Sequence, residues 1–317
     1  MKIVFLGLEK DKKSIFEGSF GDAEVSFFEE KLDENSVVLA KDADVVSVFI
    51  DSTVDKNIID ALPNLKFITT RSTGFDHIDY EYAKSKGIQV SNVPVYGSET
   101  VAEFTFALLL SLSRKIREAN FALKENRNYS TPPDAQGFDL EKKTIGVVGT
   151  GKIGKNVIRI ARGFNMNVLA YDLFPDMNFA GENNFAYKNL EEVLSQSDIV
   201  TLHAPYTKEN HHLINKENIS LFKKGAYLIN TARGELVETE ALEKALKDGS
   251  IAGAGLDVLE GEKVYKKGDN IPMLEWPNVL MTPHVAFNTR EAEARILQTT
   301  VENIQKFISD SPINLVN

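Results

Sequence analysis

The chain has 317 residues, about twice the length of a typical single domain, so its length favours two domains. Hydrophobic residues make up 43% and charged residues 26%, ordinary globular values that exclude collagen-like and disordered chains. The 36 basic and 46 acidic residues leave a net charge of −10, which argues against a nucleic-acid binder because such a protein needs a basic surface. Without cysteine the chain has no disulfide, thiolate metal site or cysteine nucleophile.

Apolar stretches in the sequence are short. The N-terminal run in MKIVFLGLEKDKK reaches charged residues before it has the length of a signal peptide. The most apolar stretch elsewhere, Phe104 to Leu112, is too short to span a bilayer. We therefore expect a soluble, cytoplasmic protein that does not insert into a membrane.

The first hundred residues alternate short apolar runs with charged stretches that have helical periodicity. The predicted strands are Lys2–Leu6, Ala43–Ile50, Leu65–Thr70 and Gly87–Ser91, and the predicted helices are Asp11–Phe16, Asp55–Leu62 and Tyr80–Lys86. This alternation is typical of a parallel sheet covered on both faces. The stretch from Ser98 to about Lys124 then predicts one long helix, with Ser98 as its N-cap.

A second alternation follows a polar, proline-bearing connection. Its predicted strands are Thr144–Val148, Asn167–Tyr171, Asp198–Leu202, Ala226–Asn230, Ile251–Leu256 and Val279–Thr282, with helices Lys152–Arg162, Asn189–Ser195 and Thr239–Lys247. Six strands with helical crossovers predict a doubly wound dinucleotide-binding sheet. A last helix, from Thr289 to about Ile308, is expected to return to the first domain.

A glycine-rich turn opens this second half. Gly149, Gly151 and Gly154 have the GxGxxG spacing, after a β-branched strand and before an amphipathic helix. Such glycines allow a pyrophosphate to approach the helix N-terminus, and Asp172, 18 residues after Gly154, is placed to accept the adenosine ribose hydroxyls. The alternatives are a glycine turn of an unrelated α/β fold and, for Asp172, a simple helix cap.

Three further residues follow predicted strands, where ligands bind in open α/β sheets. Arg233, in NTARG, has a planar guanidinium suited to a carboxylate. Glu262 and His284 provide a histidine with a carboxylate, the commonest proton donor for a carbonyl group. Taken singly, each also has a plain interpretation: a surface arginine in a turn, a loop charge and a histidine at a helix end.

The motifs together resemble one family. GTGKIG, NTARGELVET, LDVLEGE and TPHVAFNT, in this order, resemble the D-isomer-specific 2-hydroxyacid dehydrogenases. RSTGFDHID looks like the family's substrate loop, and NVPVYGSETVAEF is similar to its interdomain crossing, so the resemblance covers essentially the whole chain. VPVY, the EGE and TPHVAFNT look most like the D-lactate dehydrogenase branch, although the stretch from Glu262 to His284 is shorter than in many lactate-type members.

The resemblance implies a domain arrangement. It implies two doubly wound parallel-sheet α/β domains, in which a Rossmann domain that binds NAD, residues 98–288, is inserted in a flavodoxin-like substrate domain, residues 1–97 and 289–317. It also implies a homodimer. The apolar stripe from Phe104 to Leu112 is then either core or the dimer-forming arm of the family, and the sequence leaves both open.

The resemblance also implies roles for residues. Arg233 binds the carboxylate of a small, pyruvate-like 2-oxo acid, helped by backbone N–H groups of Thr73 and Gly74, and Tyr96 reaches into the substrate pocket. His284 is the general acid and base, and Glu262 holds its imidazole charged and oriented. The expected NAD contacts come from residues of the glycine-rich turn and of the loops after later strands: Gly149, Gly151, Lys152, Ile153, Gly154, Asp172, Ala204, Pro205, Asn210, Thr231, Ala232 and Asp257, the last of these at the nicotinamide amide.

The other histidines have plain interpretations. His211 and His212 lie in a polar stretch, which favours a solvated face over a metal pair, and we expect no metal. Two other functions remain open: an NAD(H)-sensing regulator or corepressor on the same fold, and another family activity such as a hydroxypyruvate, glyoxylate or phosphite-type dehydrogenase. The joint presence of Arg233, Glu262 and His284 favours an enzyme, since a pure binder does not need all three.

Overall fold

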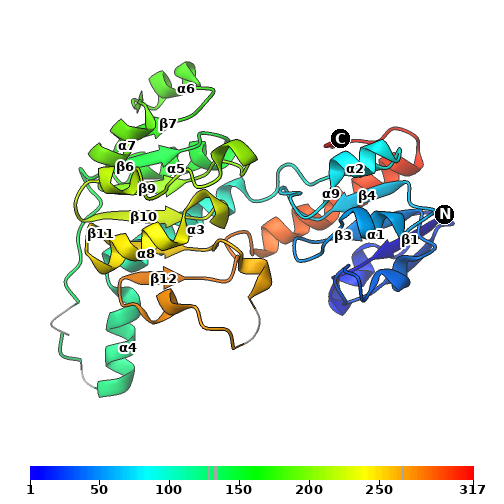
Figure 1. Ribbon diagram of the computed structural model, residues 1–317, viewed down its shortest axis with the longest axis horizontal. Helices are drawn as coiled ribbons and strands as arrows, with labels where there is room; N and C mark the ends of the chain where they lie inside the picture. The colour runs from blue at the N-terminus through cyan, green and yellow to red at the C-terminus, as the bar shows by residue number, and fades with distance from the viewer. Residues whose placement is uncertain (128, 132–134, 266–267) are drawn as a thin grey trace. The chain divides into compact units, whose positions relative to one another are not determined.

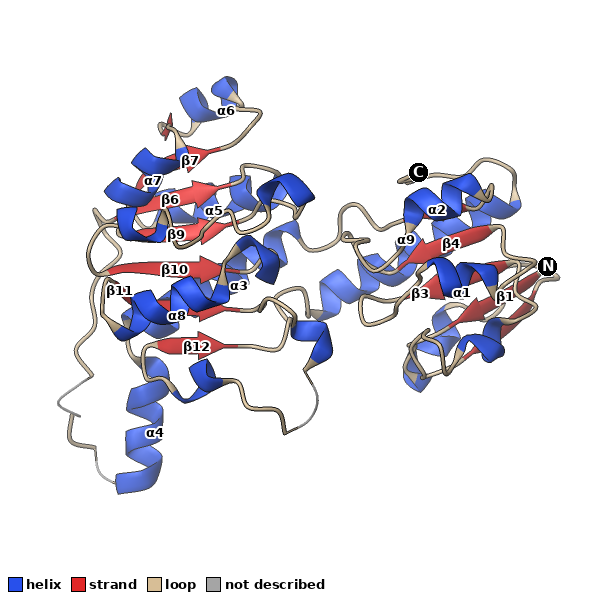
Figure 2. Cartoon of the chain, in the orientation of Figure 1, coloured by secondary structure: helices blue, strands red, loops and turns tan. Residues whose placement is uncertain are grey.

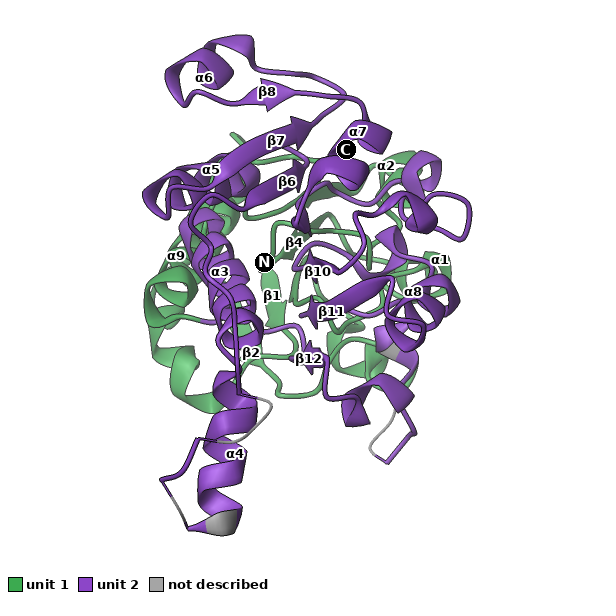
Figure 3. Ribbon diagram, turned by 90° about the vertical axis from the view of Figure 1, so that its left-hand side faces the viewer, with its two compact units in different colours: residues 1–96, 289–317 green, residues 97–288 purple. Residues whose placement is uncertain are grey.

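The structure is a computed structural model that describes residues 1–127, 129–131, 135–265 and 268–317 (Figure 1). The chain divides into two compact units (Figure 3): unit 1 comprises Met1–Tyr96 and Thr289–Asn317, and unit 2 comprises Gly97–Asn288. Each unit is a parallel sheet with helices (Figure 2), as predicted. None of the described helices combines the length and apolar character needed to cross a membrane.

In unit 1 the described residues form a five-stranded parallel sheet with the order β2-β1-β3-β4-β5, the flavodoxin-like order. The strands are β1 (Lys2–Phe5), β2 (Glu24–Phe27), β3 (Val45–Val48), β4 (Phe67–Thr70) and β5 (Gln89–Ser91). The α-helices are α1 (Lys56–Asp60), α2 (Tyr80–Ser85) and α9 (Arg290–Ile308), and Lys10–Ile15 and Val37–Ala40 are 3-10 helices.

Both faces of this sheet are buried. Ile3 and Phe5 of β1 belong to one apolar core, which also contains residues of α9, and Val4 and Leu6 belong to the core on the opposite face. Successive side chains of a strand point to opposite faces, so the uninterrupted apolar run of β1 fills both cores. Stacking of Phe307 on Phe67, with ring centroids 4.4 Å apart, fastens the C-terminal helix α9 to the sheet.

In unit 2 the described residues form a seven-stranded parallel sheet with the order β12-β11-β10-β9-β6-β7-β8. The strands are β6 (Thr144–Val148), β7 (Asn167–Tyr171), β8 (Ala186–Tyr187), β9 (Ile199–Leu202), β10 (Ala226–Asn230), β11 (Ile251–Leu256) and β12 (Val279–Met281). The α-helices are α3 (Ser98–Ser113), α4 (Ile116–Asn126), α5 (Lys152–Gly163), α6 (Met177–Glu182), α7 (Leu190–Gln196) and α8 (Thr239–Lys247). The direction of strand progression reverses between β6 and β9, the switch point at which doubly wound sheets bind dinucleotides.

The structure corrects the predicted long helix from Ser98 to Lys124. That segment forms two helices, α3 and α4, because Lys115 takes up a left-handed conformation (φ 53°) that ends the helical run. Gly97, and not Ser98, occupies the N-cap position of α3. Sequence periodicity continues across the break, so it could not reveal this single change of backbone direction.

Two strands, β2 and β8, were not predicted from the sequence. β2 is only partly buried, so its apolar signal is weak, and β8 has two residues. Both lie at the edges of their sheets. The structure also shows where the apolar stripe from Phe104 to Leu112 lies. Phe106, Leu108 and Leu109 are buried in the core that contains residues of α5 and β6, so this part of α3 belongs to the core.

Candidate active site

The predicted site residues of unit 2 follow the carboxyl ends of parallel strands. The glycine-rich turn follows β6, Asp172 follows β7, and Ala204 begins the loop after β9. Thr231 to Arg233 follow β10, Asp257 to Glu262 follow β11, and His284 follows β12. Because neighbouring strands run in the same direction, all these loops leave the sheet on the side formed by the carboxyl ends of the strands.

The glycine-rich turn requires glycine at two positions. Gly149 has φ 91°, and a Cβ there would lie 2.6 Å from the Ala204 nitrogen. A Cβ on Gly154 would lie 2.0 Å from the carbonyl oxygen of Gly149. At Gly151, directly before α5, a Cβ would meet nothing within 4 Å, so the backbone is open there. The turn therefore leaves space at the N-terminus of a twelve-residue helix, where Lys152 and Ile153 begin the first turn.

Asp172 is held firmly at the end of β7. Its Oδ2 accepts the Thr150 N–H at 2.5 Å and the Thr150 hydroxyl at 2.9 Å, and its Oδ1 accepts the Phe174 N–H at 2.8 Å. The next two side chains, Leu173 and Phe174, are 76% and 87% exposed and carry no charge. A carboxylate beside an open glycine turn, with apolar side chains next to it, fits a dinucleotide with a free ribose diol.

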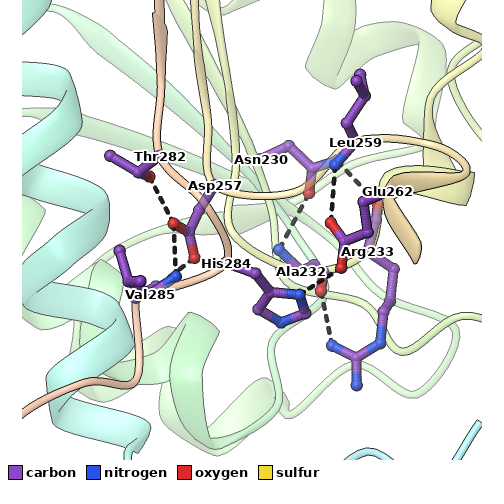
Figure 4. Close-up of polar contacts among 10 residues, drawn as sticks. Asn230, Ala232, Arg233, Asp257, Leu259, Glu262, Thr282, His284 and Val285 are labelled. Atoms are coloured by element: carbon purple, nitrogen blue, oxygen red, sulfur yellow. Dashed lines mark hydrogen bonds and ion pairs between the residues drawn. The ribbon is translucent and has the colours of Figure 1, made fainter. Parts of the chain in front are cut away.

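His284 and Glu262 form a close pair (Figure 4). Nδ1 of His284 lies 2.5 Å from Oε1 of Glu262, and Oε2 of Glu262 accepts the Leu259 N–H at 3.1 Å. Burial raises the pKa of the Glu262 carboxyl, but the hydrogen bond and charge of His284, with a smaller contribution from Arg233, hold the pKa below its ordinary value. Glu262 is therefore ionised near neutral pH and faces the imidazole as a carboxylate.

Asp257 supports the loop that carries His284 (Figure 4). Its Oδ1 accepts the Thr282 hydroxyl at 2.5 Å and the Val285 N–H at 3.0 Å, and its Oδ2 accepts the Ala286 N–H at 2.8 Å. Its backbone carbonyl accepts the His284 N–H at 2.8 Å. Burial raises the pKa of Asp257, although these hydrogen bonds oppose the shift. His284 has φ 53°, a left-handed conformation that is uncommon for residues other than glycine, and Asp257 supplies contacts that maintain it.

Arg233 lies in a tightly built turn after β10. Its Nη1 donates to the Ala232 carbonyl at 2.7 Å, and the Asn230 amide donates to the Arg233 carbonyl at 2.8 Å (Figure 4). The next residue, Gly234, lies against the peptide that joins Leu259 to Glu260, because a Cβ there would be 2.1 Å from the Leu259 carbonyl carbon. The turn that carries Arg233 and the turn that carries Glu262 are thus in direct backbone contact.

Other predicted cofactor residues lie in the same loops. The Asn210 side chain donates to the Pro205 carbonyl and accepts the Thr207 N–H, both at 2.7 Å, which closes the loop after β9. The Thr231 hydroxyl contacts the Thr105 hydroxyl of α3 at 3.0 Å. These contacts shape the loops, and the predicted NAD contacts remain predictions for each residue.

Three predicted substrate residues belong to unit 1. Thr73 and Gly74 lie in the loop after β4, where the Asn92 amide donates to the Thr73 carbonyl at 2.7 Å and the Ser72 hydroxyl donates to the Gly74 carbonyl at 2.6 Å. The backbone carbonyl of Tyr96, the last residue before unit 2, accepts Nε of Arg295 at 2.6 Å. Their roles toward a substrate remain predictions.

The structure revises the interpretation of the two adjacent histidines. His211 is exposed, but His212 is half-buried, and its Nε2 lies 2.5 Å from Oε1 of Glu260. Nothing in the local sequence indicates that these two residues, 48 positions apart, form a pair. A sequence signal for a role of Glu260 is its position: like Glu262, it follows β11, and the loops after the neighbouring strands β10 and β12 contain Arg233 and His284.

His203 is a further residue to which the sequence assigned no role. It directly follows β9, and burial lowers its pKa to about 3. Its Nε2 contacts the Thr201 hydroxyl at 2.9 Å. The imidazole is therefore neutral across the physiological pH range.

Comparison with known proteins places this geometry in a family. Residues 106–286 match the family described as D-isomer specific 2-hydroxyacid dehydrogenase, NAD binding domain. The chain is 38% identical over 280 residues to a glyoxylate reductase of Korarchaeum cryptofilum, covering 87% of this chain and 83% of that protein. It is 40% identical over 288 residues to an aromatic 2-oxoacid reductase of Clostridium sporogenes, covering 86% and 85%.

Solved structures agree with this assignment. The crystal structure of D-lactate dehydrogenase from Aquifex aeolicus, complexed with NAD and lactic acid, is similar with a TM-score of 0.91 and 36% identity, covering 99% of this chain and 98% of that one. The open glycine turn and the fixed Asp172 fit the NAD that this family uses. The chain belongs to the NAD-dependent D-isomer-specific 2-hydroxyacid dehydrogenases.

Proposed function

We propose that the protein reduces a small, pyruvate-like 2-oxo acid to the D-2-hydroxy acid with NADH. The observation that carries this proposal is the 2.5 Å contact between Nδ1 of His284 and Oε1 of Glu262. The Glu262 carboxylate also interacts electrostatically with Arg233. A proton donor and a carboxylate-binding cation next to each other are what the reduction of a 2-oxo acid requires. The substrate-specific part of the proposal is the preference for a pyruvate-like acid.

In the proposed reaction Arg233 binds the substrate carboxylate and so orients the adjacent carbonyl. NAD, when bound, supplies the hydride chemistry. The His284 imidazolium donates a proton to the carbonyl oxygen as negative charge develops there. Glu262 keeps the imidazole oriented and favours its charged form before the proton moves. In the reverse direction the neutral imidazole takes the proton from the hydroxyl group.

The remaining predicted contacts complete the proposal. The backbone N–H groups of Lys152 and Ile153 bind the pyrophosphate at the start of α5, and Asp172 binds the ribose diol. The proposed cofactor contacts thus lie in unit 2, and the proposed substrate residues Thr73, Gly74 and Tyr96 lie in unit 1. The other proposed NAD contacts come from the loops after β9, β10 and β11: Ala204, Pro205, Asn210, Thr231, Ala232 and Asp257.

The activity is tested with a panel of 2-oxo acids and NADH, followed by the loss of NADH absorbance. Pyruvate, glyoxylate, hydroxypyruvate and phenylpyruvate separate the substrate classes, and phosphite with NAD tests the phosphite-type alternative. We expect the highest kcat/KM with pyruvate. A protein that binds NADH but oxidises it with none of these acids would be a nucleotide-sensing binder, and the enzymatic proposal would be wrong.

We further propose that the protein is a homodimer that uses α4. Two large apolar side chains of this helix, Ile116 and Phe121, are 54% and 64% exposed in the single chain. Exposed apolar side chains on one helix favour association. Light scattering coupled to size exclusion should give the mass of a dimer for the parent and a monomer for Phe121→Glu. A monomeric parent would contradict the proposal.

A further inference from the structure

Glu260 joins three segments of unit 2 outside the His284–Glu262 pair. Its Oε1 lies 2.5 Å from Nε2 of His212, in the loop that follows β9. Its Oε2 accepts the Thr239 hydroxyl at 3.0 Å and the Thr239 N–H at 3.4 Å, at the first residue of α8. Glu260 itself lies on the turn that carries Glu262. One carboxylate therefore connects the loop after β9, the start of α8 and its own turn after β11.

The connected segments are those that carry the proposed catalytic groups. The backbone N–H of His212 donates to the Glu235 carbonyl at 2.9 Å, two residues after Arg233. Ile214 pairs with Val237 through an isolated parallel bridge, so the His212 loop runs along the segment that follows Arg233. Gly234 lies against the Leu259–Glu260 peptide. The His212–Glu260 contact therefore closes a ring of contacts around the turns of Arg233 and Glu262.

The contact between His212 and Glu260 is partly buried. The side chains of His212 and Glu260 are each 29% exposed. Burial raises the pKa of Glu260, but the hydrogen bonds from His212 and Thr239 outweigh it and hold the pKa below its ordinary value. Glu260 is thus a carboxylate that accepts from two side chains and one backbone N–H, and partial burial limits screening by water.

The geometry favours a direct hydrogen bond over a metal ion. Within the described residues, one group of three or more His, Asp or Glu side chains has potential metal-ligand atoms that all lie within 4.8 Å of one another. It consists of His211, His212 and Glu260. Two ligands of a single zinc ion, each about 2.0–2.2 Å from it in a tetrahedral arrangement, are separated by more than 3 Å. The 2.5 Å separation of the His212 and Glu260 atoms leaves no room for an ion between them.

We propose that His212 and Glu260 are positioning residues, which act as a clasp that holds the Leu259–Glu262 turn and keeps Glu262 in hydrogen-bond contact with His284. The mechanical link is short. Glu260 is two residues from Glu262, and the Leu259 N–H that bonds to Glu262 Oε2 belongs to the neighbouring residue. Loss of the clasp frees one end of this turn while leaving Glu262 and His284 in the chain. The inference rests on the proposed function only where activity is the readout.

The test compares the clasp variants Glu260→Ala, Glu260→Gln and His212→Asn with a control on α8. Glu243→Gln removes a carboxylate that pairs with Lys247 and forms no hydrogen bond or ion pair with the clasp residues. His211 is unsuitable as a control because its ring stacks on that of His212, with ring centroids 3.8 Å apart. We expect Glu260→Ala and His212→Asn to lower reductive kcat by about tenfold or more, with little change in the Kd of NADH. Glu260→Gln keeps a hydrogen-bonding side chain and should lose less.

A second readout does not depend on turnover. The proton in the 2.5 Å contact of His284 with Glu262 should give a low-field ¹H NMR resonance, which is assigned by its loss in Glu262→Gln. This resonance should shift or broaden in Glu260→Ala and persist in Glu243→Gln. Unchanged kcat and an unchanged resonance in folded Glu260→Ala, as judged by its thermal transition, would overturn the clasp. If the parent reduces no 2-oxo acid, the proposed function fails, and the resonance still decides the clasp.

Discussion

Nδ1 of His284 lies 2.5 Å from Oε1 of Glu262, although the two residues follow different strands and are 22 positions apart. Each is held by its own anchor. Asp257 binds the backbone around His284, and the Leu259 N–H binds the second oxygen of Glu262. Asp257 and Leu259 belong to the same loop after β11 that carries Glu262, so this one loop supplies both anchors and brings the two side chains together.

Substitution Glu262→Gln should shift the pH dependence of both reaction directions. The pKa of Glu262 is held below its ordinary value, so the carboxylate is charged throughout the working range and favours the imidazolium. Glutamine removes that charge and keeps the shape. We expect the alkaline fall of reductive kcat/KM to begin at lower pH, with partial loss of rate, and the acid limb of the oxidative profile to move in the same direction.

His284→Ala serves as the reference for that experiment. General acid catalysis contributes roughly 10²–10⁴-fold, so His284→Ala should lose far more activity than Glu262→Gln. Among the described residues of unit 2, the carboxylates of Asp257 and Glu262 each interact electrostatically with His284, and Arg233 interacts with Glu262. An alkaline limb that stays in place in Glu262→Gln would show that Glu262 does not tune His284.

Arg233→Lys should weaken binding of the 2-oxo acid specifically. Lysine keeps the charge but loses the planar fork, and charge-assisted hydrogen bonds contribute about 1.5–3 kcal/mol each. We expect KM for the 2-oxo acid to rise by about tenfold or more while the Kd of NADH is unchanged. Arg159→Lys, on the exposed side of α5, is the matched control and should leave KM at the parent value. An unchanged KM in Arg233→Lys would place the carboxylate site elsewhere.

Asp172→Ala should narrow the preference for NADH over NADPH. The 2′-phosphate of NADPH would meet the Asp172 carboxylate, which three hydrogen bonds hold in place, and two like charges near a surface repel by about 1–4 kcal/mol. Alanine removes the repulsion and also a ribose contact. We expect the ratio of kcat/KM for the two cofactors to fall by about tenfold or more, and equal ratios in parent and variant would contradict the assignment of Asp172.

Asp257→Asn should impair both stability and catalysis. The amide NH₂ group would face at least one of the donors that now bind the carboxylate, the Val285 and Ala286 N–H groups and the Thr282 hydroxyl, and a buried unsatisfied donor costs about 1–3 kcal/mol. We expect a lower Tm and a lower kcat. Asp198→Asn is the control. Asp198 accepts a hydrogen bond from the Thr144 N–H at the amino ends of the strands, on the side of the sheet away from the proposed active site. That variant should lose Tm and keep kcat.

His203 should make the folded protein less stable in acid. Its pKa is about 3 in the folded protein and about 6.5 in the unfolded chain, so between these values the unfolded chain binds the extra proton. The free energy of unfolding therefore falls as pH drops from about 6.5 towards 3, by up to about 1.4 kcal/mol per pH unit from this group. The free energies of unfolding of the parent and of His203→Gln, measured with denaturant, should converge as pH falls. A constant difference between them at every pH would contradict this prediction.

Much of the fold followed from local patterns in the sequence. Parallel strands buried on both faces are continuous apolar runs, so β1, β6, β9 and β10 were predicted with nearly correct bounds. The glycine-rich turn was recognisable because its requirements are local: Gly149 needs a positive φ, and Gly154 packs on Gly149 itself. The family motifs likewise named Arg233, Glu262 and His284 one by one.

Long-range contacts were beyond such patterns. The 2.5 Å contact of His212 with Glu260 joins positions 48 residues apart, and neither side chain shows in its own segment that it is paired. The break between α3 and α4 depends on one left-handed residue, Lys115, inside a continuous helical periodicity. The sequence defines which residues stand at the ends of strands, because that depends on local backbone preference and burial. Which of these residues touch depends on strand order and loop packing, since the sheet brings together loops that periodicity treats as unrelated.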